Sequence, residues 1–156
     1  MAKNREFFTS ESVTEGHPDK ICDQIADAIV TDILQHDRNA RVAIECLLKK
    51  SQLFIAGEVT TDYRPNYNQI VHDVFNRIGA EKLGWNLTEL LRIGILVDKQ
   101  SPDIAMGVDK ALEARESKMS DEQTEALGAG DQGMMFGYAS NETEEYMHYP
   151  ISCLLY

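Results

Sequence analysis

The strongest constraint on the fold is an isoleucine stripe near the amino end of the chain. The stripe recurs every four residues, at Ile21, Ile25, Ile29 and Ile33. Ala28 adds to this stripe, and the other face carries Asp23, Asp27, Asp32 and Gln35, which is the pattern of an amphipathic helix. Pro18 suits a first helical position, with His17 as the cap and Asp19 in the first turn. The sequence therefore predicts a helix over about residues 18–36, buried on one face.

Two alternating segments follow this helix. Residues 41–48 and 53–60 each alternate apolar and polar side chains, as a half-buried strand does. The link over 49–52 is short enough for a hairpin, so the two strands are predicted to pair antiparallel.

The remaining pattern predicts a second helix and two more strands. An amphipathic helix follows Pro65 and stops at Gly79, and strands are expected over 90–97 and 134–139. Most of residues 98–133 are polar and rich in loop formers. Helices and strands without strict alternation indicate an α+β fold, with a mixed or antiparallel sheet and amphipathic helices on one face.

Charge and composition narrow the possible partners. The formal net charge is −11, which argues against nucleic acid, because phosphate backbones are bound by clustered lysines and arginines. No apolar run reaches the roughly 20 residues that a membrane helix needs. The chain starts without an apolar leader, and its three cysteines are widely spaced. We therefore expect a cytoplasmic protein that binds neither nucleic acid nor membrane.

The predicted helix start is the first candidate site. His17 and Asp19 would lie beside unpaired backbone N–H groups, where the helix dipole favours anions. Asp19 offers an oxygen ligand for Mg²⁺ while phosphates supply others. His17 can hydrogen-bond or protonate a leaving oxygen. The alternative is an ordinary helix cap, which spacing alone favours.

The hairpin carries the second candidate, Glu45 and Glu58. If the turn centres on residues 50–51, Glu45 lies opposite Ala56 and Glu58 opposite Ala43, so both carboxylates share one face about 7–8 Å apart. The small alanines leave space for a cation or an ammonium group. A slip of one residue would separate the two glutamates, and the alternative is a solvated strand face.

Two loops form the third candidate. The segments KQSPDI at 99–104 and GAGDQG at 128–133 flank a charged stretch, as the ends of an active-site lid do. The glycine-rich segment precedes an apolar strand instead of following one, so it does not match a dinucleotide-binding loop. A long surface loop is the alternative.

Together these segments resemble the S-adenosylmethionine synthetase (methionine adenosyltransferase) family. The matching stretches, in family order, are FTSESV at 8–13, EGHPDK at 15–20, GEVTT at 57–61, KQSPDI at 99–104, GVD at 107–109, and 128–137 running into NET at 141–143. The resemblance implies that methionine sulfur attacks C5′ of ATP, and that triphosphate is released and hydrolysed to pyrophosphate and phosphate.

The resemblance also implies a role for each matching residue. His17 would contact ATP and act in catalysis, Asp19 would bind Mg²⁺, Glu45 would bind K⁺, Glu58 would bind the methionine ammonium, Gln100 would bind its carboxylate side, and Asp131 would lie close to the substrates. We expect Asp19, Glu45 and Glu58 to face one common pocket.

The family builds three similar α+β domains in a chain more than twice as long, with active sites between subunits of a dimer or a dimer of dimers. By that pattern, residues 1–12 are an opening strand available to the following domain, and 13–110 are the amino-terminal domain. Residues 100–130 are a mobile active-site loop, and 131–156 begin a truncated central domain. We expect the 156-residue chain alone to be inactive.

Two other functions remain open at this point. A non-catalytic interaction module would pair with a full-length synthetase and modulate it. An unrelated Mg²⁺-dependent phosphohydrolase would release phosphate without methionine.

Overall fold

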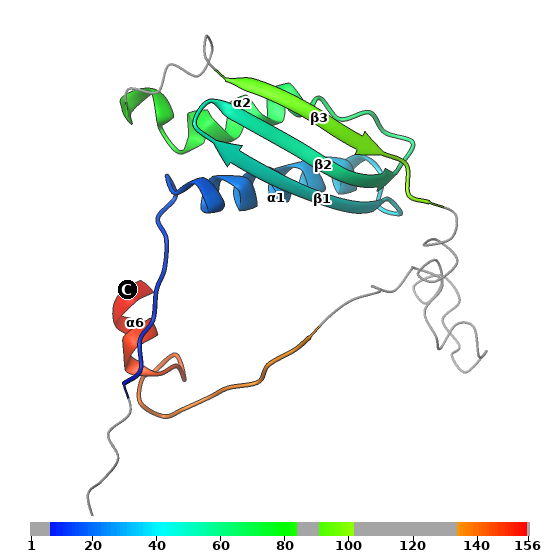
Figure 1. The fold of residues 1–156 in the computed structure, drawn as a ribbon. Helices are drawn as coiled ribbons and strands as arrows, with labels where there is room; N and C mark the ends of the chain where they lie inside the picture. Colours follow the sequence, from blue (N-terminus) through cyan, green and yellow to red (C-terminus); the bar gives the residue numbers. More distant parts are fainter. Residues whose placement is uncertain (1–6, 84–90, 102–133, 156) are drawn as a thin grey trace, which may run out of the picture. The chain divides into compact units, whose positions relative to one another are not determined.

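The computed structural model describes residues 7–83, 91–101 and 134–155 (Figure 1). The chain divides into two compact units, each of which is described by itself. The larger unit is Glu15–Gln132, and the smaller combines Met1–Thr14 with Gly133–Tyr156.

The larger unit is a three-stranded mixed sheet with helices on one face (Figure 1). Its elements are, in chain order, α1 (Pro18–His36), β1 (Arg41–Lys49), β2 (Gln52–Thr60), α2 (Tyr67–Arg77), the 3₁₀ helix η1 (Ala80–Leu83) and β3 (Arg92–Asp98). Strand β2 is central, pairing antiparallel with β1 and parallel with β3. The predicted α+β class, with its helices on one side of a mixed sheet, is confirmed.

The element boundaries follow local signals in the sequence. Helix α1 has the predicted bounds, with Pro18 in its first turn and His17 as its cap. The hairpin turns at Lys50, which adopts a positive φ of 54°. After α2 the chain changes direction at Gly79, whose φ of 73° suits a residue without a side chain.

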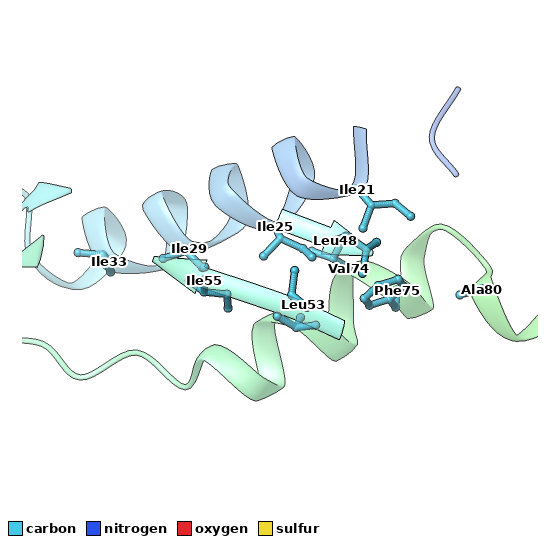
Figure 2. Packing of buried hydrophobic residues seen from close by; sticks show 11 residues of the cluster. Ile21, Ile25, Ile29, Ile33, Leu48, Leu53, Ile55, Val74, Phe75 and Ala80 are labelled. Atoms are coloured by element: carbon cyan, nitrogen blue, oxygen red, sulfur yellow. The ribbon is translucent and has the colours of Figure 1, made fainter. Parts of the chain in front are cut away.

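The core lies between the helices and one face of the sheet (Figure 2). All four isoleucines of the α1 stripe are 0% exposed. They pack with side chains from the sheet and from α2, which are Leu48, Leu53, Ile55, Val71, Val74 and Phe75. Burying such side chains contributes about 1.5–3 kcal/mol each, so this face dominates the stability of the unit.

The smaller unit differs from its prediction. The strand predicted over residues 134–139 is wrong, because these residues form no strand. The helix α6 (Tyr149–Leu155) was not predicted. Met135 and Phe136 are almost fully exposed, and a strand is stable only when a neighbour pairs with it. The segment 7–14 also lacks strand structure, but the ring of Phe8 meets His148 edge-on at 4.3 Å.

Within the described residues, no helix combines the length and the apolar character needed to cross a bilayer.

Candidate functional site

The start of α1 is a capped helix end that displays a carboxylate. The His17 side chain accepts the backbone N–H of Asp19 at its Nδ1, 3.2 Å away. The Asp19 carboxylate lies 3.9 Å from the same nitrogen, and its side chain is 87% exposed. The cap occupies Nδ1, so a ligand would meet the His17 ring at Nε2. The cap and an anion or metal site are therefore compatible on this helix end.

The hairpin glutamates occupy one face, as the predicted register requires. Glu45 pairs with Ala56, and Ala43 pairs with Glu58. Because side chains alternate along a strand, both carboxylates lie on the face opposite the helices, which we call the open face. Glu45 is exposed and Glu58 is half-buried. The alanines beside them leave room for a small cation or an ammonium group.

Charge and apolar character are segregated along the open face. From one end to the other, the rows across β1, β2 and β3 are Ala43–Glu58–Asp98, Glu45–Ala56–Leu96, Leu47–Phe54–Gly94 and Lys49–Gln52–Arg92. The first end is acidic, the middle is apolar, and the far end is basic. A ligand with an ammonium group would be attracted to the acidic end.

Asp98 is a neighbour of Glu58 that sequence reasoning did not single out. The two residues are register partners in the parallel β2–β3 pair. Like charges placed side by side repel, so a cation or an ammonium group between them would be stabilising. The signal was present in the sequence, since Asp98 closes a strand just before Gln100. That Asp98 lies beside Glu58 could be recognised only from the pairing of β2 and β3.

Gln100 lies at the same end of the sheet as Glu58. It follows β3 by two residues, and its Oε1 accepts a hydrogen bond from Nε of Arg41, 3.1 Å away. Arg41 is the first residue of β1 and pairs with Thr60. The structure thus brings together Glu58 and Gln100, two residues that the sequence separates by about forty positions.

The helix start lies at the other end of the sheet. Cys22 in the first turns of α1 lies next to the backbone of Leu48, whereas Asp37 at the far end of α1 accepts a hydrogen bond from the Thr61 hydroxyl. A helix of 19 residues is about 28 Å long. Asp19 is therefore far from Glu58, and it lies on the helix side of the sheet.

A single chain does not form the common pocket expected for Asp19, Glu45 and Glu58. No group of three or more metal-binding side chains occurs among the residues that the structure describes. Asp131, and the predicted loop from residue 102 onward, lie outside the described residues.

The geometry defines a class: an α+β domain whose uncovered sheet face carries acidic side chains at one end. Family comparison makes the assignment specific. Residues 5–102 match the S-adenosylmethionine synthetase N-terminal domain, and residues 126–154 match the central domain of the same enzyme. The chain belongs to the S-adenosylmethionine synthetase family.

A solved structure agrees with this assignment. The chain is similar to an unusual S-adenosylmethionine synthetase from Campylobacter jejuni, with 34% sequence identity and a TM-score of 0.71. The similarity covers 94% of this chain but 34% of the relative, so the chain spans about a third of that protein's length.

Proposed function

We propose that this chain supplies part of an active site that makes S-adenosylmethionine from ATP and methionine. The sulfur attacks C5′ of ATP, triphosphate leaves, and the triphosphate is hydrolysed to pyrophosphate and phosphate. The observation that carries the proposal is the convergence of Glu58 and Gln100 at one end of the open face, in a chain of this family.

The family resemblance suggests a role for each residue, and the chemistry of the side chains is compatible with those roles. The Glu58 carboxylate pairs with the methionine ammonium, and the Gln100 amide binds methionine on the side of its carboxylate. For Asp131, which lies outside the described residues, we propose a role close to the bound substrates. At the helix start, His17 contacts ATP near the leaving triphosphate, where unpaired backbone N–H groups also favour phosphate.

Two cations fit the residues present. Asp19 is an exposed oxygen donor at a helix start, which suits Mg²⁺ shared with phosphate oxygens. Glu45 lies beside small alanines on the open face, which leaves room for K⁺. Bound Mg²⁺ would stabilise charge on the leaving triphosphate.

The main contribution of the chain's own residues is to align methionine with ATP. A thioether is a neutral and modest nucleophile, so fixing methionine relative to C5′ removes much of the entropic barrier. An ammonium held by Glu58 and a carboxylate fixed near Gln100 define two points of the substrate. Both groups are on the methionine Cα, so the two contacts fix the position and orientation of that carbon, from which the sulfur-bearing side chain extends.

Within one chain, the helix start and the acidic end of the open face lie far apart, and we call these two places the half-sites. Two copies of the chain could bring one half-site of each together. One copy would provide His17 and Asp19, and the other would provide Glu58 and Gln100, as in a dimer or a dimer of dimers. The apolar middle of the open face supports this, because Leu47 and Leu96 are 65% and 64% exposed. Exposed apolar patches of this kind mark protein interfaces. The assembly would act in the cytoplasm.

Ligand-dependent stability tests the proposal. A ligand that binds the folded state raises the midpoint of thermal unfolding, by an amount set by its concentration relative to Kd. We expect methionine and Mg²⁺-ATP each to raise it. Glu58→Gln removes the methionine shift, and Asp19→Asn removes the Mg²⁺-ATP shift.

Asp27→Asn is the matched control, since Asp27 is an exposed acid on α1 remote from both half-sites. It should keep both shifts. Loss of either shift in Asp27→Asn, or no response of the unmodified chain to either ligand, would contradict the proposal.

The exposed Leu47 and Leu96 of the open face also fit a second function, a non-catalytic module that pairs with a full-length synthetase. Assays of S-adenosylmethionine formation separate the two. A module alters the rate of an added full-length synthetase without turning over substrate itself.

A further inference from the structure

The contact between Arg41 and Gln100 is unusual because it bridges strands that are not neighbours. Arg41 begins β1, Gln100 follows β3, and β2 lies between those strands. Two strand spacings amount to about 9.5 Å. The Arg41 side chain therefore extends across the end of β2 to reach the Gln100 amide, and the contact is partly buried.

Alternation places this contact on the open face. Arg41 points to the same side as Ala43 and Glu45, and Gln100 stands two residues beyond Asp98. The Arg41–Gln100 contact is thus adjacent to the row that contains Glu58. It lies at the end of the face where an ammonium group would be held.

The chemistry of the two side chains fixes which way the amide points. A guanidinium group has only donors, so the atom of Gln100 that faces it must be the carbonyl oxygen. The NH₂ group of the same amide must then point away from Arg41. An NH₂ group donates hydrogen bonds, and an ionised carboxylate can only accept them, so the two groups are suitable partners.

We propose that Arg41 is a positioning residue that orients the Gln100 amide so that its NH₂ group donates to the carboxylate of the bound amino acid. This inference rests on the proposed function, because it assumes that methionine binds with its ammonium at Glu58.

Calorimetric titration with methionine and with methioninol, its alcohol analogue, tests this role. Arg41→Met keeps much of the apolar stem but removes every donor. We expect it to weaken methionine binding about tenfold, the typical effect of losing one charge-assisted hydrogen bond. Methioninol has no carboxylate, so its affinity should not change. Arg41→Lys should restore part of the methionine affinity.

The Gln100→Ala background shows whether Arg41 acts through Gln100. There, Arg41→Met should cause no further loss, because the positioned group is already gone. Arg92→Met is the matched control, an exposed arginine at the far end of the same face. It should leave both affinities unchanged. Unfolding midpoints of all variants show that each is folded.

Three results would overturn the inference. Arg41→Met could weaken both ligands equally, could weaken methionine equally in the Gln100→Ala background, or could have no effect. If the unmodified chain binds neither ligand, the proposed function fails as well. If it binds methionine through Glu58 but ignores Arg41→Met, only the positioning role fails.

Discussion

The two faces of the sheet are built from the same three strands but are used in opposite ways. Leu48 on the covered face is 7% exposed, whereas its neighbour Leu47 on the open face is 65% exposed. Leu53 and Ile55 are 0% exposed, while Phe54 between them is 43% exposed. One residue along the chain therefore separates a side chain that stabilises the fold from one available for binding.

This division explains how the sheet can carry acids at all. A carboxylate on the covered face would lose its hydration without gaining a partner, which is strongly unfavourable. On the open face Glu45, Glu58 and Asp98 keep contact with solvent. Stability thus depends on one face, and the other is free to carry a site.

The largest expected effect tests the backbone on which both faces depend. Gly57 has a φ of +145°, and a Cβ there would collide with the carbonyl oxygen of Ala43 in β1. Gly57→Ala should therefore lower the free energy of unfolding by about 4 kcal/mol, through strain and loss of strand pairing. Chemical denaturation measures this.

Gly94→Ala is its counterpart on the open face. The added methyl group would meet a movable side chain, Phe54, at 2.9 Å. A rotation of Phe54 relieves that contact, so the loss should be much smaller. Equal losses for the two substitutions would contradict the strain at Gly57.

The next effect separates the faces directly. Ile25→Ala on the covered side removes a side chain that is 0% exposed and should destabilise the chain by about 3 kcal/mol. Leu47→Ala on the open side should change the stability of the monomer by less than about 0.5 kcal/mol. A large loss for Leu47→Ala at low protein concentration would mean that the open face contributes to folding within one chain.

Much of the covered face could be predicted from sequence. The isoleucine stripe gave the bounds of α1, and the alternation of β1 and β2 gave the register that aligns Glu45 with Ala56. Both are local periodicities, set by the geometry of a helix and of a strand. The hairpin turn is also local, so its register follows from the loop length.

What sequence could not supply was the pairing of distant segments. The parallel contact of β2 with β3 places Asp98 beside Glu58, and it brings Gln100 within reach of Arg41. Neither follows from periodicity, because each depends on a connection of more than thirty residues. The expected strand over 134–139 failed for a related reason: its apolar run was read correctly, but a strand also needs a neighbour.

A smaller effect concerns the link between the covering helix and the end of the open face. Asp37 at the end of α1 accepts the Thr61 hydroxyl at 2.7 Å and the Asp62 N–H at 3.3 Å. The Thr61 hydrogen bond, followed by backbone N–H groups, lowers the pKa of Asp37 below its usual 3.8.

The sign of the pH dependence follows from that direction. A lowered pKa means that the ionised carboxylate stabilises the fold above pH 3.8, and that this contribution is lost as the pH falls through the lowered value. Asp37→Asn should reduce stability at pH 7 modestly and should flatten the acid limb of a stability–pH curve. An unchanged acid limb would show that the link contributes nothing.

The smallest effect concerns reactivity, and it compares adjacent residues on opposite faces. Cys46 lies on the covered side, where burial, followed by repulsion from the Cys22 thiol, raises its pKa to about 11. At pH 8 only about one molecule in a thousand carries the reactive thiolate, so Cys46 should resist alkylation until the chain unfolds. Leu47→Cys, in a Cys153→Ser background, adds a second thiol one residue away on the open face, and this new thiol should react quickly. Rapid labelling of Cys46 would mean that α1 does not cover β1.

The same variant tests the proposed second copy. If the apolar middle of the open face lies against another chain, labelling of the Leu47→Cys thiol should slow as protein concentration rises, while Cys46 stays slow throughout. A labelling rate independent of concentration, up to the level at which the chain sediments as an oligomer, would place the contact between copies elsewhere. The helices of the same chain cover one face of the sheet at any protein concentration. A second chain can cover the open face only when the concentration is high enough for the two copies to associate.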